Sequence, residues 1–556
     1  MDKSFKMVIR SEIMSLAKNS LLFTAGTSIS RVSGLVRDMV LAATFGSSNL
    51  LEAFFVANRI PNLFREMLAE GALGGAFTKV YTSVASEDTA RARKLIFDML
   101  RISACMLVLI SLLGFLLAPY LVRIFTLYSD NSGRPDTFVA YTVGLTRVLF
   151  PFLGVAILSS VVMGVLYERG RFFISALAPI FLNFGYIFGA LVLGGYFAKF
   201  APSWVETSIA DPRIVGLAVG VLLGGVGHFL IQFYFVWKDL IKGETWDFGQ
   251  QWFSADVRNV IRIMIPAAIA ASSGPINLLV VTNFATSLGT GAVSWLSYAF
   301  RLFQLPVGLF GVAVGAAVLP ALTRKVTAAK GHMDRSVSLE LENALEFILW
   351  VMVPCCVFLQ VNSIELVELL FERGKFSHND TLQTASALYA YSFGVVSYGL
   401  VKVLMSFYYA AERTSFAMKV SIVAIVVNFV CNLFLVKVWG HVGLAATAAA
   451  TLSFNALILF LGVKASGIHF NTSNLLKTLG YISVAFLTSY YLQSFCRFFV
   501  GGLDLGVVYM NSMKTAGLLV LNGIVVCAVF GAMAMLKMGW SPKYVSSKIK
   551  GAWKRN

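Results

Sequence analysis

The stretch that decides the fold spans residues 19–45 and reads NSLLFTAGTSISRVSGLVRDMVLAATF. It is long enough for an α-helix to cross roughly 30 Å of hydrocarbon, yet it carries Arg31, Arg37 and Asp38. An ionised side chain facing lipid at mid-depth costs at least roughly 2.5–3.5 kcal/mol on insertion scales. These charges are tolerable only where they face water or one another, so the stretch predicts a membrane helix that lines an internal polar cavity.

The polar residues of this stretch recur at intervals of three and four, the spacing that places side chains on one face of an α-helix. The stripe consists of Thr24, Thr27, Ser28, Arg31, Gly34 and Asp38, and is widened by Ser30 and Arg37. We expect this face of the helix to point into the protein.

Composition extends the same conclusion to the whole chain. Its 556 residues are 58% hydrophobic and 13% charged, whereas a soluble globular protein carries about 25% charged residues. The low charged fraction predicts a polytopic membrane protein. The net charge of +17 does not indicate nucleic-acid binding, because the basic residues gather at the two ends and between apolar blocks, and no RNA- or DNA-binding motif accompanies them.

The apolar blocks predict an all-α protein with about fourteen membrane-spanning helices. They lie near 19–45, 50–83, 96–120, 138–166, 173–197, 212–237, 257–287, 291–323, 343–370, 383–411, 416–437, 441–463, 474–494 and 514–536. An even number places both ends of the chain on one side of the membrane. Basic residues in both termini and in the segments 91–94, 169–171 and 324–325 mark that side as cytoplasmic.

Two pairs of short motifs recur at nearly the same offset. In the first pair, Thr44-Phe-Gly46 leads into Val56-Ala-Asn-Arg59, and Ser287-Leu-Gly289 leads in the same way into Tyr298-Ala-Phe-Arg301. In the second pair, Leu182-Asn183-Phe184 corresponds to Val427-Asn428-Phe429. The offsets are about 242 and about 245 residues, as expected for the internal repeats of a transporter. The alternative is chance similarity between apolar segments, which share few residue types.

The repeat predicts a domain organisation in which two halves of six helices each meet at a substrate site. We expect an N-terminal lobe over 1–240 with helices one to six, and a C-terminal lobe over 241–466 with helices seven to twelve. Residues 467–556 are expected to form two additional helices and a basic cytoplasmic tail. Since each half enters the membrane from the same side, an axis along the membrane normal would relate the two.

The second expected span is both charged and broken. Its polar members are Glu52, Asn58, Arg59, Asn62, Arg65, Glu66 and Glu70. Pro61 removes a backbone donor and bends a helix, and Gly71 weakens it further. Such a span is tolerated only where it is buried in protein or lines a cavity. We expect Pro61, Glu66, Glu70 and Gly71 to act in gating or bending, together with Gly308 near Arg301 in the second half.

The expected cavity is richer in arginine than in carboxylate. Its arginines would be Arg31, Arg37, Arg65 and Arg301, with Arg59 as a further candidate. Because a guanidinium group pairs with phosphate through a planar fork and keeps its charge, this composition predicts an anionic, phosphate-bearing substrate. The alternatives are internal ion pairs of Arg31 with Asp38 or of Arg59 with Glu52, and a helix-anchoring role for Arg65.

Signals for catalysis and for metal or cofactor binding are weak. The chain contains six cysteines and five histidines, none at metal-ligand spacing, and the segment Gly71–Gly75 lacks the lysine of a phosphate-binding P-loop. The charged N-terminus favours a retained first span over a cleaved signal peptide. We therefore expect a transporter without a cofactor, driven by an ion gradient or the membrane potential, and not an enzyme.

Several motifs together resemble the MurJ/MviN family of bacterial lipid II flippases. They include Ser30-Arg-Val-Ser-Gly-Leu-Val-Arg-Asp38, Ala53-Phe-Phe-Val-Ala57, Pro61-Asn-Leu-Phe-Arg65, Ala69-Glu-Gly-Ala72, Ser294-Trp295, Tyr298-Ala-Phe-Arg-Leu302, Pro306-Val-Gly308, Leu319-Pro320 and Phe371-Glu-Arg-Gly-Lys-Phe376. They occur in the family's order and cover most of the chain. The resemblance implies the fold of the multidrug/oligosaccharidyl-lipid/polysaccharide exporters, with two six-helix lobes around a V-shaped cavity.

The resemblance also implies a task and a site. The task is to move lipid II, the undecaprenyl-diphosphate-linked peptidoglycan precursor, from the cytoplasmic to the periplasmic leaflet of the inner membrane, as part of cell-wall biogenesis and the maintenance of cell shape. The expected substrate-binding residues are Arg31, Arg37, Arg65, Arg301, Ser30, Glu52, Asp38, Ser294 and Arg59. The two extra helices would form a groove for the lipid tail, and cell-wall synthesis proteins are possible partners.

Two departures from the family pattern concern acidic positions, where this chain has Phe300 and Gln304. They leave the arginine set intact and put coupling schemes based on carboxylates in doubt. The alternative functions are an exporter of another polysaccharide lipid or of drugs, a membrane-embedded transferase acting on lipid-linked sugars, and a scaffold for cell-wall enzymes. A drug exporter would need an acid-rich cavity, a transferase would need a catalytic Asp or His, and a scaffold would leave the intramembrane arginines unexplained.

Overall fold

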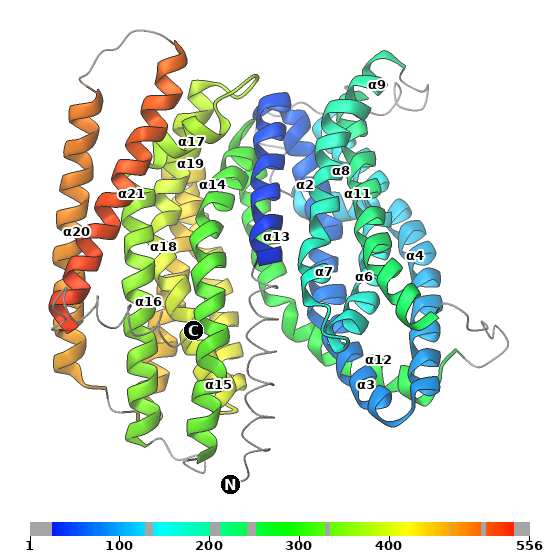
Figure 1. The fold of residues 1–556 in the computed structure, drawn as a ribbon. Helices are drawn as coiled ribbons and strands as arrows, with labels where there is room; N and C mark the ends of the chain where they lie inside the picture. Colours follow the sequence, from blue (N-terminus) through cyan, green and yellow to red (C-terminus); the bar gives the residue numbers. More distant parts are fainter. Residues whose placement is uncertain are drawn as a thin grey trace. The chain divides into compact units, whose positions relative to one another are not determined.

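The computed structural model describes residues 25–127, 137–200, 212–241, 252–328, 334–468, 470–501 and 508–538. Within these ranges every regular element is a helix, as Figure 1 shows. The predicted all-α fold class is therefore confirmed. Thr24 of the polar stripe and the basic ends of the chain, residues 1–24 and 539–556, lie outside the described residues.

In the described part of the chain, eight helices are long and apolar enough to cross a membrane. They are Thr89–Phe125, Thr137–Glu168, Phe172–Lys199, Pro212–Leu240, Arg335–Val361, His378–Ala410, Thr414–Ala465 and Met513–Lys537. These spans agree with a multi-pass membrane protein, while the count of about fourteen stays a prediction. The expected second, seventh and eighth spans divide into shorter helices: the second at Arg65 and Gly74, the seventh at Ser272, and the eighth at Val307 and Val312.

The chain forms two compact units, each described here by itself. The first comprises Met1–Ser294 together with the short segment Arg373–Ser377, and the second comprises Trp295–Glu372 and His378–Asn556. The predicted lobes 1–240 and 241–466 rest on a sequence repeat rather than on contacts, and they remain a prediction.

The first unit opens with a helix over residues 25–45. The elements that follow are α2 (Asn49–Phe64), η1 (Arg65–Leu73), α3 (Gly74–Glu87), α4 (Thr89–Phe125), α5 (Thr137–Leu149), α6 (Pro151–Glu168), α7 (Phe172–Leu177), α8 (Pro179–Phe188), η3 (Gly189–Leu193), α9 (Gly194–Lys199), α11 (Pro212–Val236), η4 (Trp237–Ile241), α12 (Ala255–Ala271) and α13 (Ser273–Thr286). Most of α6 is buried, since helices pack on several of its sides.

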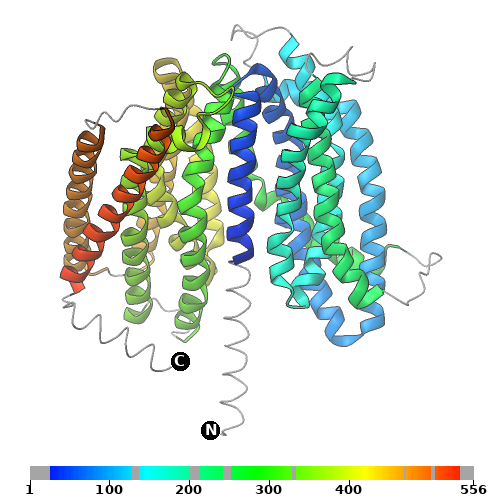
Figure 2. The same ribbon diagram turned by 45° about the horizontal axis from the view of Figure 1, so that its top comes forward.

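Glycines bring α8 and α11 into backbone contact. Gly216, Gly220 and Gly224 lie four residues apart on α11, and a Cβ at Gly185 of α8 would come within 2.5 Å of the Cα of Gly224. Small residues at this spacing let membrane helices approach closely enough for extensive van der Waals contact. The two helices lie side by side in Figures 1 and 2, so α8 and the residues it carries are held tightly in the unit.

The helix α2 continues into a π-helical segment, η1, before α3 begins. The backbone N–H of Gly74 reaches the Ala69 carbonyl oxygen, the i to i+5 pattern of a π-turn. That oxygen also accepts a hydrogen bond from Ser160 Oγ on α6 at 2.5 Å. A side chain of a neighbouring helix thus stabilises the irregular part of the expected second span.

The second unit contains most of α14 and the helices that follow it. Its elements are α14 (Ala292–Pro306), η5 (Val307–Gly311), α15 (Val312–Ala328), α16 (Arg335–Val361), α17 (Ser363–Phe371), α18 (His378–Ala410), α19 (Thr414–Ala465), α20 (Thr472–Gly501) and α21 (Val508–Met538). A non-helical backbone at Gly440 (φ 55°) kinks α19 and separates the two spans that the sequence predicts on either side of it.

The last two helices pack against α16. A core of Leu349, Val353, Val357, Ile482, Ala485, Val526 and Phe530 joins them to that helix. A buried amide cluster adds polar contacts, because Asn362 Nδ2 donates to Gln493 Oε1 at 2.9 Å and Asn522 Nδ2 donates to Asn362 Oδ1 at 2.6 Å. Figure 2 shows α20 and α21, in orange and red, side by side.

Candidate functional site

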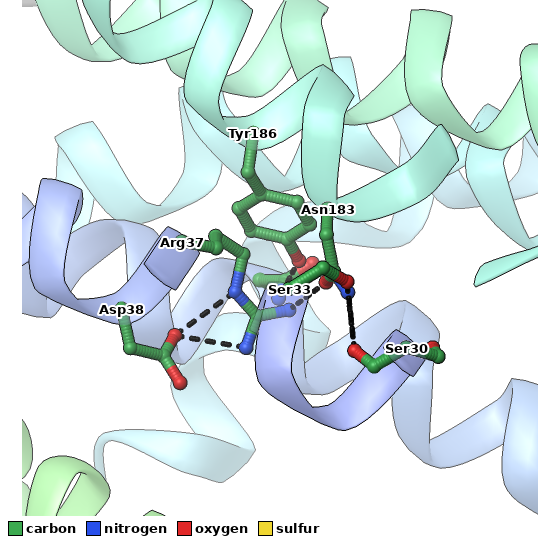
Figure 3. Close-up of polar contacts among 7 residues, drawn as sticks. Ser30, Ser33, Arg37, Asp38, Asn183 and Tyr186 are labelled. Atoms are coloured by element: carbon green, nitrogen blue, oxygen red, sulfur yellow. Dashed lines mark hydrogen bonds and ion pairs between the residues drawn. The ribbon is translucent and has the colours of Figure 1, made fainter. Parts of the chain in front are cut away.

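The guanidinium group of Arg37 lies at the centre of a polar cluster in the first unit (Figure 3). Arg37 Nε and NH2 both approach Asp38 Oδ1, at 2.9 and 2.8 Å. Arg37 is 9% exposed and Asp38 5%. Pairing compensates part of the cost of burying both charges, and it explains how a membrane helix accommodates them.

Asn183 on α8 fixes the other edge of this guanidinium group. Its Oδ1 accepts from Arg37 NH1 at 2.9 Å, and its Nδ2 donates to Ser33 Oγ at 2.7 Å and to the Ser30 carbonyl oxygen at 3.1 Å. Asn183 is 6% exposed. One amide side chain therefore joins α8 to two successive turns of the first helix.

Tyr186 and two asparagines connect Arg37 to Arg65. The ring of Tyr186 lies 4.8 Å from the Arg37 guanidinium carbon, and its hydroxyl accepts from Asn58 Nδ2 at 2.8 Å. Asn62 Nδ2 donates to the Asn58 carbonyl oxygen at 2.8 Å, and Arg65 Nε donates to Asn62 Oδ1 at 2.9 Å. The structure thus brings Ser30, Arg37, Asp38 and Arg65 into one network.

Arg65 faces the interior of the first unit. It pairs with Glu66 at 4.0 Å and lines a cavity of about 100 Å³ together with Ser159, Met163 and His228. A volume of this size holds a few water molecules.

Arg31 lies partly exposed on the first helix. Within the described ranges it takes part in no hydrogen bond or ion pair, whereas Asp38, its possible partner from the sequence, pairs with Arg37. Arg59 NH1 donates to Thr282 Oγ1 on α13 at 2.8 Å. Arg59 therefore contributes to the attachment of α13 to α2.

Glu52 stabilises the beginning of α14. Its carboxylate is fully buried and accepts from the backbone N–H groups of Val293 and Ser294, at 2.7 and 3.1 Å. A carboxylate is favourable at this position because the first N–H groups of a helix have no partner within it and carry partial positive charge. The Ser294 hydroxyl is buried and has no hydrogen-bond partner within the described residues.

The remaining candidates lie in irregular or separate parts of the chain. Pro61 is buried near the end of α2, and Glu70 and Gly71 lie within η1, although the surroundings of these last two fall outside what the structure describes. Gly308 lies in η5, and Arg301 is exposed on α14. Since Arg301 belongs to the second unit, a chamber that it shares with the other arginines stays a prediction.

The sequence did not single out Asn58, Asn62 or Asn183 as site residues, nor Tyr186. Asn183 carried one signal, its place in the motif repeated around Asn428. Tyr186 carried none, because a tyrosine in an apolar block is as common in a core as in a site. Among the described residues, no group of three or more His, Cys, Asp or Glu could hold a metal ion.

Comparison with known proteins places this arrangement in a family. The family model described as "Lipid II flippase MurJ" matches residues 41–537. The chain is 33% identical over 460 residues to "Probable lipid II flippase MurJ" of Vibrio cholerae, covering 82% of this chain and 84% of the relative. It is 32% identical over 460 residues to "Lipid II flippase MurJ" of Burkholderia cenocepacia, covering 82% and 85%.

Solved structures agree on the fold. The structure described as "Lipid II flippase MurJ, inward closed conformation" has a TM-score of 0.72 at 23% identity, covering 93% of this chain and 99% of that one. An inward-facing multidrug transporter of the MATE family has a TM-score of 0.63 at 15% identity, covering 78% and 94%. The extent of the family match and the identity to its members confirm the resemblance drawn from the motifs: the chain belongs to the lipid II flippase MurJ family.

Proposed function

We propose that this chain is a lipid II flippase. It moves the undecaprenyl-diphosphate-linked peptidoglycan precursor from the cytoplasmic to the periplasmic leaflet of the bacterial inner membrane, with both of its own termini in the cytoplasm. Membership of the family supports this function. The single structural observation that carries it is the network joining Arg37 and Arg65 inside a unit of largely apolar helices.

The chemistry of the substrate explains why such arginines are kept. A diphosphate that leaves water must find other donors, since burying an unpaired charge is very costly. Guanidinium groups supply charge-assisted hydrogen bonds to phosphate oxygens. Arg31 is the candidate for direct contact in the first unit, because it is partly exposed. Arg37 and Arg65 shape the positive surface around it, and Arg301 contributes from the second unit.

Transport would proceed by alternating access, in which two lobes rock about the substrate site. Glu52 would keep the beginning of α14 attached to α2 within the first unit, because its carboxylate holds the first N–H groups of α14. Pro61, the π-turns of η1 and η5, and Gly308 supply places where helices bend. The work would come from an ion gradient or the membrane potential. On this proposal the protein acts as a transporter and catalyses no covalent step.

The test is a leaflet-accessibility assay with lipid II in vesicles that contain the purified protein. Arg37→Ala and Arg301→Ala are expected to abolish flipping while leaving membrane insertion intact. The matched control is Arg147→Ala, since Arg147 is partly exposed and bonds to the Phe115 carbonyl oxygen away from the network. Wild-type rates in both test variants would refute the role of the two arginines, and the absence of flipping by the wild-type protein would refute the proposed function.

A cellular experiment checks the substrate independently. Depletion of the protein in its host is expected to make lipid II accumulate on the cytoplasmic face of the membrane. Accumulation of a different lipid-linked saccharide would instead favour the alternative of an exporter for another polysaccharide lipid.

A further inference from the structure

We infer that Asn183 and Tyr186 are positioning residues for the arginines of the substrate site. The inference rests on the proposed function and deepens it, because it names groups that act on the diphosphate through Arg37 and Arg65. Both residues lie on α8, three positions apart, so they present adjacent side chains to the same guanidinium group. Figure 3 shows both beside that group, with Asp38 across the group from Asn183.

The contacts of Arg37 fix its orientation from three directions. Asp38 binds one edge through Nε and NH2, Asn183 binds NH1, and the guanidinium carbon lies over the ring of Tyr186, 4.8 Å from its centroid. A guanidinium group is planar and its N–H donors lie in that plane, so contacts at two of its edges restrict both its plane and its rotation within the plane. The positive charge that Arg37 contributes around the proposed phosphate contact at Arg31 is thereby fixed in place.

Asn183 is suited to this role because it uses both ends of its amide. The oxygen holds Arg37, and the nitrogen holds Ser33 and the Ser30 carbonyl oxygen one to two turns earlier. Asn183 therefore fixes the orientation of Arg37 relative to the helix that carries the polar stripe. Aspartate at position 183 would keep an acceptor for Arg37 but lose both donations, and it would compete with Asp38 for the same charge.

Tyr186 extends the arrangement to a second arginine. Its hydroxyl accepts from Asn58, whose carbonyl oxygen accepts from Asn62, whose side-chain oxygen accepts from Arg65. Phenylalanine at 186 would keep the ring against Arg37 and remove only the link to Asn58. This substitution separates the effect on Arg65 from the effect on Arg37.

The test measures binding of a short-chain polyprenyl diphosphate, and of its monophosphate as a comparison, to the purified full-length chain in detergent. Asn183→Leu is expected to weaken diphosphate binding about tenfold, the effect of losing a charge-assisted hydrogen bond, and to reduce the preference over the monophosphate. Asn432→Leu is the matched control, because it removes a buried amide bonded to Asn428, far along the chain from this network. We expect it to bind as the wild type does.

A double-mutant comparison distinguishes positioning from general stability. In an Arg37→Ala background, Asn183→Leu should cause no further loss of binding, since the group it orients is absent. In an Arg65→Ala background, Tyr186→Phe should likewise have no further effect. Additive losses in both backgrounds would overturn the inference, as would an Asn183→Leu variant that binds with wild-type affinity.

The outcomes keep the two proposals separate. If the wild type fails to distinguish diphosphate from monophosphate, the proposed recognition of a diphosphate fails. If it distinguishes them and only the Arg37→Ala variant loses this ability, the proposed function stands and the role of Asn183 fails. Should Asn183→Leu not fold, Ser33→Ala and Tyr186→Phe still test the network, because each removes one hydroxyl and little volume.

Discussion

The backbone N–H of Lys375 donates to the Ala43 carbonyl oxygen at 2.9 Å. Two glycines make this approach possible. A Cβ on Gly46 would lie 2.5 Å from the Lys375 carbonyl oxygen, and a Cβ on Gly374 would overlap the Ala43 carbonyl oxygen. Both glycines have positive φ, 64° and 59°. The segment Arg373–Ser377 is thus fastened to the end of the first helix by backbone contacts that no other residue type would permit.

Alanine at Gly46 or Gly374 should therefore destabilise the protein in two ways. The left-handed backbone costs a residue with a Cβ about 1–2 kcal/mol, and the close contact must also open. We expect a lower midpoint of thermal unfolding in detergent for both variants. Gly170→Ala is the control, because Gly170 has φ 69° but nothing within 4 Å of its Cβ position. An equal loss in all variants would show that the close contact contributes nothing.

Replacement of Glu52 should weaken the beginning of α14. Glu52→Leu leaves the N–H groups of Val293 and Ser294 without their acceptor in a buried place, which costs about 1–3 kcal/mol. Glu52→Gln keeps an acceptor oxygen and should lose less. Chemical unfolding in detergent measures the difference, with Glu87→Gln, at an exposed site, as the control. A Glu52→Leu variant as stable as the wild type would exclude the capping role.

The contact between α8 and α11 should be sensitive to a single methyl group. At Gly220 a Cβ would collide with backbone atoms of Gly185 and Gly189, so Gly220→Ala should cost about 1–3 kcal/mol through overpacking. At Gly531 in α21 an added Cβ would have no atom within 4 Å, so Gly531→Ala should be neutral or slightly stabilising. Thermal unfolding of the two variants compares them, and equal midpoints would contradict the packing argument.

The beginning of α16 should weaken in acid. Hydrogen bonds from Ser336 Oγ and from the backbone N–H of Val337 hold the pKa of Asp334 below its ordinary value of 3.8. Since the carboxylate is favoured in the folded state, its contribution is complete above pH 3.8 and is lost as the pH falls through the lower folded pKa. Amide hydrogen exchange at Ser336 and Val337 should accelerate relative to the intrinsic rate over that range.

Asn at position 334 provides the control for this pH dependence. It keeps an oxygen acceptor for the first N–H groups of the helix but has no titrating group. Amide hydrogen exchange in the Asp334→Asn variant should therefore show no such acid transition. A transition of the same size in both proteins would assign it to another group.

The membrane class of the protein and the faces of its first helix could be predicted from the sequence, because both follow from the cost of charge in hydrocarbon. The stripe containing Ser30 and Arg37 does face α8. The division of the expected second span into α2, η1 and α3 could not be located, since Pro61 lies within α2 and the helix changes form four residues later. Contacts with α6 decide that position.

The sequence predicted part of the polar network, and a role of its residues in substrate binding stays a prediction. Arg37, Asp38 and Arg65 were identified as polar residues that must be accommodated, and the structure provides their partners. Asn183 and Tyr186 were missed, because an uncharged residue in an apolar block carries no cost large enough to demand an explanation. Glu52 was assigned to substrate binding or gating, whereas its bonds to Val293 and Ser294 also give it a capping role. Such a role depends on a partner about 240 residues away, which no local pattern reveals.

The π-helical form of η1 has a consequence for how this part of the gene tolerates length changes. Each of its turns holds roughly one residue more than an α-helical turn, so the residues beyond it are out of phase with those of a continuous α-helix. Deletion of a single codon between 65 and 73 would let the segment become regular and would rotate α3 about its own axis. Tyr81 and Val84, both buried, would then leave their present neighbours, although no residue of α3 itself had changed.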